Sequence, residues 1–205
     1  MIRLALFVLA ACFVNSGATA QSSSERAAIL ERIVDGLNSP DPVSRLITLE
    51  GAFESKDQTI RRLAAQTALS SSDYNLRSAS LEYLLASKPS YLVTLDRDSE
   101  HKNEVWDFVG GVIDVSVVGF AKGTGEFLAV SSHSALDRKN STQIAGRGNL
   151  AGDRLSFAVN IKGTTYNSTL NECKAAGVLQ PTGSIVSGSL ICGPERYNFS
   201  MDVLR

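Results

Sequence analysis

A sixteen-residue repeat in the first half of the chain constrains the fold more strongly than any other sequence feature. Each copy begins with Asp and has Arg four residues later, and the Asp residues are separated by 57 − 41 = 16 and 73 − 57 = 16 positions. Apolar residues follow each Arg after four and after eight positions. Sixteen residues hold about three helical turns and a short connection, so the repeat predicts a stack of short helices. The repeated pairs are Asp41 and Arg45, Asp57 and Arg61, and Asp73 and Arg77.

The polar residues of the repeat fit helix starts and contacts between helices. Asp is a favoured N-cap, because its carboxylate accepts hydrogen bonds from the free backbone N–H groups of the first turn. Pro42 follows Asp41 at the first helical position, where its missing N–H costs no hydrogen bond. We therefore expect the three Asp residues to cap helices and the three Arg residues to hydrogen-bond between them. Apolar residues at helical spacing predict one further helix before the repeat, ending near residue 37.

The spacing Asp-x-x-apolar-Arg-x-x-Ala in residues 41–88 resembles the second helix of HEAT-type repeats. The second copy matches best, with Asp57, Ile60, Arg61 and Ala64. The first copy departs from the pattern, since Ser44 stands at the apolar position. A HEAT unit is a helix pair of ~40 residues, whereas this period provides one helix per copy. The resemblance implies contact with another protein, or a scaffold role. Caps and inter-helix hydrogen bonds explain the Asp and Arg residues without a partner.

The first twenty residues have the features of an export signal. Arg3 is their one charged residue, residues 4–14 are apolar, and small residues at 18 and 20 offer a signal-peptidase site after Ala20. The apolar run is too short to span a bilayer of ~30 Å as a helix. A second hypothesis is a lipoprotein, because residues 9–12 resemble the bacterial lipobox, and an acylated Cys12 would tether the chain to a membrane. We expect a periplasmic or secreted protein, tethered to a membrane only if Cys12 is lipidated.

The second half of the chain changes to the period of β-strands. After Pro89, residues 91–104 are read as a boundary whose second part is highly polar. Ile113, Val115 and Val117 then alternate with polar residues, and further short strands are expected with turns every eight to twelve residues. Residues 148–155 and 183–190 look alike, and each reads as strand, tight turn and strand. About seven short strands predict an antiparallel β-barrel or β-sandwich.

Two cysteines and two aromatic residues are the candidate special positions of this half. After removal of the signal, Cys173 and Cys192 remain, and an even pair in an exported chain most often forms a disulfide. Trp106 and Phe108 open the β domain and are possible binding residues, although a core plug at the domain junction is the preferred interpretation. We therefore predict an α+β protein in four parts: a signal (1–20), an antiparallel HEAT-like helical stack (21–90), a linker (91–104) and a β domain (105–205).

Several classes of function are disfavoured by the sequence. The formal net charge is −1 with both signs interleaved, which lacks the basic stripe of a nucleic-acid binder. There is no Gly-x-Ser-x-Gly elbow and no His-Glu-x-x-His pair, and no motif for a metal or cofactor. The leading hypothesis is a non-catalytic exported protein that binds another protein. The alternatives are a barrel that carries a small apolar ligand, and a cell-envelope hydrolase. The hydrolase would need His133 or His101, a Ser, and an acid such as Asp137 or Asp114 brought together by the fold.

Overall fold

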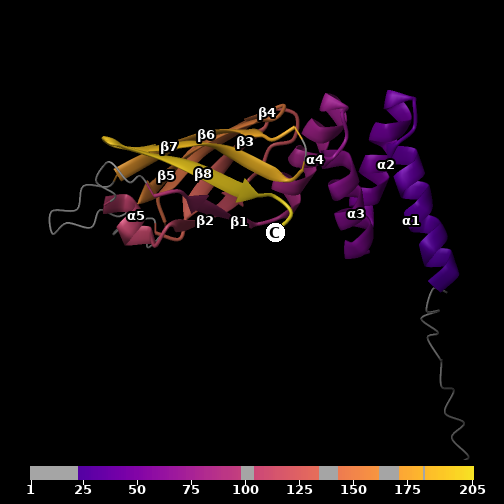
Figure 1. Cartoon of the computed structure of the whole chain (residues 1–205), viewed down its shortest axis with the longest axis horizontal. Helices are drawn as coiled ribbons and strands as arrows, with labels where there is room; N and C mark the ends of the chain where they lie inside the picture. Colours follow the sequence, from indigo (N-terminus) through magenta and orange to yellow (C-terminus); the bar gives the residue numbers. More distant parts are fainter. Residues whose placement is uncertain (1–22, 98–103, 134–142, 162–170, 182) are drawn as a thin grey trace, which may run out of the picture.

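The computed structural model describes residues 23–97, 104–133, 143–161, 171–181 and 183–205. Within these ranges, a stack of four helices is joined to a closed barrel of eight antiparallel strands, and a fifth, short helix lies at the far end of the barrel (Figure 1). The predicted α+β class is confirmed. The choice that the sequence left open, barrel or sandwich, is resolved as a barrel.

The helical stack follows the sixteen-residue repeat. The helices are α1 (Ser23–Leu37), α2 (Pro42–Glu54), α3 (Gln58–Leu69) and α4 (Tyr74–Ser87). Asp41, Asp57 and Asp73 are the N-caps of α2, α3 and α4, and each carboxylate accepts a hydrogen bond from at least one backbone N–H group of the first turn. These bonds satisfy donors that a helix start otherwise leaves unpaired. Every copy of the repeat therefore sets the start of one helix.

Two Arg residues connect helices that are second neighbours in the stack. Arg45 of α2 donates from Nε to the Asp73 carboxylate at 2.9 Å, so the cap of α4 is also bound by α2. Arg26 of α1 lies 3.1 Å from the Asp57 carboxylate and joins α1 to α3 in the same way. Because each Asp caps its own helix and accepts from another, the pairs fix how the helices are stacked.

The other two Arg residues of the repeat behave differently from Arg45. Arg77 of α4 donates to the carbonyl oxygen of Pro181 at 2.9 Å and lies 3.9 Å from Asp153, and so binds two turns of the barrel. The side chain of Arg61 makes no hydrogen bond or ion pair to the described residues. The position sixteen residues after the last cap, 73 + 16 = 89, is Pro89, and a strand follows instead of another helix.

The barrel is a simple meander in which each strand pairs with the next and the last pairs with the first. The strands are β1 (Ser90–Leu95), β2 (Val112–Val118), β3 (Glu126–Ser131), β4 (Ala145–Ala151), β5 (Arg154–Ile161), β6 (Asn171–Leu179), β7 (Ile185–Cys192) and β8 (Glu195–Asp202). Closure leaves no free sheet edge. The linker predicted over 91–104 needs correction, because its first five residues belong to β1, with Tyr91, Val93 and Leu95 buried inside the barrel. Helix α5 (Glu104–Val109) occupies the predicted start of the β domain.

Helices close both ends of the barrel. Leu81 and Leu85 of α4 belong to the same buried cluster as the inward side chains of the strands, and Val105 and Val109 of α5 join this cluster too. Figure 1 shows α4 and α5 at opposite ends of the barrel. The stack and the barrel therefore share one hydrophobic core through α4. A smaller cluster, which includes Leu49, lies between the helices.

The predicted disulfide is present. Cys173 of β6 and Cys192 of β7 are directly opposite each other in the sheet and are bonded, with their Cα atoms 4.2 Å apart. Both side chains are almost completely buried inside the barrel. The bond joins strands that are already neighbours, so it reinforces the wall of the barrel near the α5 end.

Two strands differ from the sequence prediction. Strand β6 was not predicted, because its inward residues Cys173, Ala175 and Gly177 are too small to produce a clear alternation of apolar and polar residues. The predicted turn within residues 183–190 was wrong, since Ile185–Cys192 is one continuous strand. The similar segment 148–155 does form the β4–β5 hairpin. One of the further short strands expected from the sequence falls on residues 165–170, which lie outside the described residues.

Candidate functional site

The two aromatic candidates of the sequence lie on α5. The half-buried Trp106 packs against the barrel core, donates from Nε1 to the Leu95 carbonyl oxygen at 3.0 Å, and has the Arg97 guanidinium 5.2 Å from its ring. Phe108 is 40% exposed and makes an edge contact with the His133 ring. Residues two apart on a helix do not share a face. Trp106 is thus engaged in closing the barrel, and the two rings do not form a joint platform.

Within the described chain, the hydrogen bonds of the candidate hydrolase residue His133 are all made to its immediate neighbours, and the Phe108 ring contacts its ring edge-on. Its Nδ1 lies 3.1 Å from the Oγ of the adjacent Ser132, and its backbone N–H donates to Ser131. Of the other candidates, His101 and Asp137 lie outside the described residues, and no hydrogen bond or ion pair joins the described Asp114 carboxylate to the His133 ring. Ser, His and acid must lie in hydrogen-bonded sequence for nucleophilic catalysis. The described groups around His133 provide the first two without a carboxylate bonded to the ring.

The interior of the barrel is filled by side chains. Tyr91, Phe127, Phe157, Tyr197 and Phe199 are each at most 5% exposed and belong to one continuous buried cluster. A barrel of eight strands is just wide enough either to be filled by its own side chains or to hold one small ligand. The described inward residues therefore form a packed core where a carrier would need a cavity.

The outer side of α2 carries a row of exposed apolar residues. Val43 is 60% exposed, Leu46 38% and Ile47 64%. Their spacing places them on one side of the helix, while Leu49 and Ala52 on the other side are buried in the stack. Most large apolar side chains gain free energy by leaving water. We call Val43, Leu46, Ile47 and Gly51 the α2 face. Exposed apolar side chains gathered on one side of a helix are a candidate interaction surface.

Gly51 continues the α2 face at the next four-residue interval after Val43 and Ile47. A Cβ atom built on Gly51 would meet nothing within 4 Å. No packing within the described chain therefore requires Gly there. Gly in a helix interior is less stable than Ala by roughly 0.5–1 kcal/mol. The glycine does allow another backbone to approach α2 closely at this position.

A groove of about 220 Å³ lies beside the α2 face, between α2, α4 and the turn after β2. We call it the α2–α4 groove. Its walls include Leu46 and Glu50 of α2 and Glu82 and Tyr83 of α4. Lys122 of the turn also lines the groove, with its Nζ 4.4 Å from the centre of the Tyr83 ring. The groove therefore combines an apolar wall and an aromatic ring with carboxylates, and already receives one cation.

Charges around Tyr83 define the electrostatics of this groove. Burial raises the pKa of the Tyr83 hydroxyl above its ordinary value, and the nearby carboxylates of Glu50, Glu54 and Glu82 raise it further. A negative environment disfavours the phenolate and favours a cation such as the Lys122 ammonium. Glu82 also accepts a hydrogen bond from the Gly123 backbone N–H at 3.0 Å, which holds the turn next to the groove. The groove is built to hold positive charge over an aromatic face.

Sequence reasoning did not identify the α2 face. Its signal was present, because Val43, Leu46 and Ile47 are spaced as one side of a helix that also carries Leu49 and Phe53 on the others. A helix that is apolar on several sides is expected inside a stack, and so the sequence suggested burial. Only the structure separates the covered side of α2 from the uncovered one.

Neither a metal centre nor a membrane-spanning helix is found among the described residues. No group of three or more potential metal ligands is present among the described residues. Within the same residues, the helices are too short or too polar to cross a membrane. Comparisons of the chain with protein-family models, with curated proteins and with solved structures found no match. The resemblance to HEAT repeats therefore rests on the local pattern of residues 41–88 alone.

Proposed function

We propose that this chain is an exported, non-catalytic binding protein that docks a basic amphipathic helix of another protein. The docking site is the α2 face together with the α2–α4 groove. The observation that carries the proposal is the exposed apolar row of Val43, Leu46 and Ile47 beside an acidic groove. An apolar helix face and a groove match the way amphipathic helices are recognised, through anchors spaced three and four residues apart.

Charge complementarity favours a basic partner. Glu50, Glu54 and Glu82 surround Tyr83, and Lys122 shows how an ammonium group fits over the ring. A Lys or Arg of the partner helix would meet the same carboxylates. A second copy of this chain is a poorer occupant, because a symmetric contact would place the acidic groups of both copies against each other.

Export is part of the same proposal. The first twenty residues have the order of charged, apolar and small residues that a signal peptide requires. The buried disulfide between Cys173 and Cys192 is typical of proteins that fold in an oxidising compartment. Both features support a periplasmic or secreted location, with cleavage after Ala20 preferred to lipidation of Cys12.

The test is affinity capture from the envelope fraction of the source organism with three matched baits. Wild-type protein and Gln66→Asp, which adds the same charge at an exposed site on α3, should retain one partner, and Ile47→Asp should lose it. Cross-linked peptides should place a basic segment of that partner on the α2 face. Equal retention by all three baits, or a contact segment without basic residues, would contradict the proposal.

A further inference from the structure

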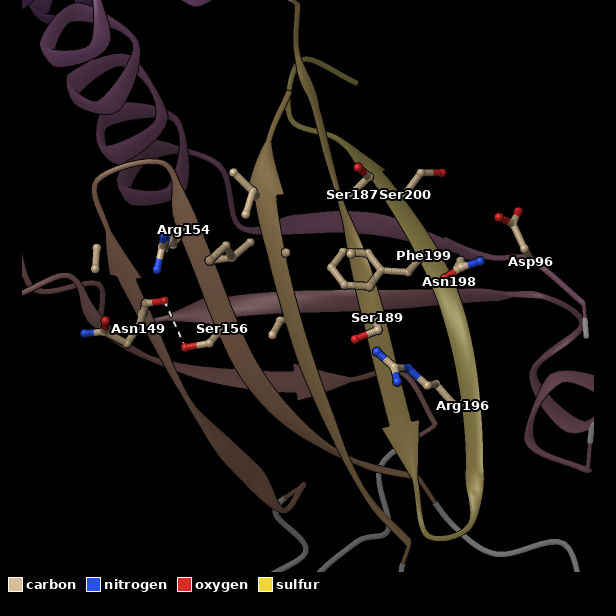
Figure 2. A pocket seen from close by; sticks show the side chains of 16 residues that line it. Asp96, Asn149, Arg154, Ser156, Ser187, Ser189, Arg196, Asn198, Phe199 and Ser200 are labelled. Carbon is tan, nitrogen blue, oxygen red and sulfur yellow. Dashed lines mark hydrogen bonds between the residues drawn. The ribbon is translucent and has the colours of Figure 1, made fainter. Parts of the chain in front are cut away.

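A shallow trough crosses the outer surface of the barrel, far from the α2 face in the chain. It runs over β4 to β8 and has a volume of about 860 Å³ (Figure 2). Figure 2 shows polar side chains of several strands projecting from this side of the sheet. Most of the floor consists of small residues, and the exposed Val178 lines the trough beside them. The small residues are Ser156, Ala176, Gly177, Ser187, Gly188 and Ser189.

The floor of the trough is a fixed part of the barrel wall. A Cβ on Gly188 would lie 2.0 Å from the carbonyl oxygen of Ala176, and a Cβ on Gly177 would lie 2.7 Å from the Phe199 ring. Neither position therefore accepts a side chain without displacement of its neighbours. The Phe199 ring, 2% exposed, fills the space beneath. Since the paired strands hold the floor in place, a ligand meets a surface that is already formed.

A row of polar groups crosses the trough at right angles to the strands. The strand register places Asn149 opposite Ser156, and Ser189 opposite Asn198, with Ala176 between the two pairs. Four steps of about 4.8 Å between neighbouring strands make this row roughly 19 Å long. The side chains of Ser189 and Asn198 make no hydrogen bond to other described residues. Asn149 Nδ2 donates to the Thr124 carbonyl oxygen at 3.2 Å and Ser156 Oγ to the Asn149 carbonyl oxygen at 3.5 Å, so Ser189 and Asn198 are the members of the row left to bind a ligand.

Two guanidinium groups flank this row. Arg154 of β5 and Arg196 of β8 line the trough at separate places (Figure 2). Within the described chain, neither forms an ion pair or a side-chain hydrogen bond. Asp96 is the one acidic residue among the lining residues. The guanidinium fork matches a carboxylate with two parallel hydrogen bonds, so the two Arg side chains favour an anionic ligand over a neutral one.

We infer that the trough binds a chain of sugars that carries carboxylates. The Ser and Asn groups match the many hydroxyls of a glycan, and Arg154 and Arg196 match its carboxylates. An acidic peptide fits less well. The closed barrel offers no free edge on which an extended peptide could add as a strand, and the Ala, Gly and Ser floor has no deep pocket for apolar side chains. This site is separate from the proposed protein-docking site on α2.

The test is titration calorimetry of the purified protein with three probes at low salt: oligogalacturonate, neutral dextran of similar length, and poly-glutamate. Oligogalacturonate should bind, and its affinity should fall as salt rises. Arg154→Ala and Arg196→Ala should each weaken it by roughly tenfold, because a charge-assisted hydrogen bond contributes about that factor. Arg62→Ala, an exposed Arg of α3 outside the trough, should have no effect.

A variant without any change of charge provides a second readout. Ser189→Leu fills the floor and removes a hydroxyl while leaving both Arg residues in place, and should also weaken oligogalacturonate at least tenfold. Unchanged circular dichroism spectra would show that the variants fold. The inference is overturned if oligogalacturonate does not bind, if poly-glutamate binds equally well, or if Arg62→Ala weakens binding as much as Arg154→Ala.

Discussion

Helices α2 and α4 come from the same repeat but differ in what covers them. Both begin with a capping Asp, and both are apolar on more than one side. In α4 the second side, with Leu81 and Leu85, is buried against the barrel. In α2 the residues at the same repeat positions, Leu49 and Phe53, pack within the helical stack, whereas Val43 and Ile47 on another side of the helix face solvent. The buried repeat positions thus join α4 to the barrel and α2 to the stack, and in our proposal α2 uses a further apolar side, outside the repeat pattern, as a docking surface.

From this comparison, substitution of Leu81 should cause the largest loss of stability. This side chain is completely buried between stack and barrel, so Leu81→Ala should reduce the free energy of unfolding by about 2–5 kcal/mol. Ile47→Ala, at the exposed side of α2, should change it by less than about 0.5 kcal/mol. Urea unfolding followed by circular dichroism measures both. A loss at Ile47 as large as that at Leu81 would mean that α2 is covered within the chain.

The barrel should depend on its disulfide, whereas the helices of the stack have none. Replacing Cys173 and Cys192 together by Ala should lower the free energy of unfolding by about 3 kcal/mol, mainly because the unfolded chain regains entropy. Guanidinium unfolding of both proteins under oxidising conditions measures this difference in the free energy of unfolding. If the double variant is as stable as the wild type, the wall of the barrel does not need this bond.

The caps of α2 and α4 should differ in strength and in their dependence on pH. The bond from Arg45 and those from the Leu76 and Asn75 backbone N–H groups hold the pKa of the Asp73 carboxyl below its ordinary value of 3.8. Asp73→Asn keeps a capping oxygen but removes the negative charge that pairs with Arg45, and should therefore cost about 0.5–1 kcal/mol near pH 7.

The sign of the pH effect follows from that lowered pKa. A carboxyl whose pKa is lower in the folded state stabilises the fold above its unfolded pKa, and this contribution is lost as pH falls toward the folded value. The stability difference between wild type and Asp73→Asn should therefore shrink below about pH 4. Asp41→Asn, whose carboxylate has no Arg from a second helix bonded to it, should show a smaller difference at pH 7. Equal losses of stability at both positions would show that the Arg45 contact adds nothing to the strength of the α4 cap.

Gly51 should show the smallest change in stability and the opposite sign. Gly51→Ala should raise the free energy of unfolding by roughly 0.5–1 kcal/mol, because Ala restricts the unfolded chain and nothing lies where its Cβ would be. The same variant should weaken binding of the partner if another helix approaches α2 here. A thermal melt and a binding titration on one sample separate the two effects. Destabilisation by Ala would contradict the open space at this position.

Local rules predicted some parts of the molecule and not others. The Asp caps, the helix period and the disulfide follow from residues close in sequence or from pairing two cysteines, and each is present in the structure. The closure of the barrel was harder to predict, because it depends on the pairing of β8 with β1. The local sequences of residues 90–95 and 195–202 do not indicate that these strands pair. Strand β6 was not predicted because its inward residues are too small to give a clear apolar alternation. The docking face and the trough depend on which sides remain uncovered, and a sequence pattern does not specify that.

The measurement that tests the central claim most directly is site-specific photo-cross-linking in the source organism, with the photoreactive residue at position 47 of α2 or at position 66 of α3. Our account predicts a single protein adduct from position 47, mapped to a basic amphipathic helix and abolished by Glu50→Lys together with Glu82→Lys. Position 66 should give none. No adduct at position 47, or the same adducts from both positions, would show that the uncovered side of α2 is not a docking surface.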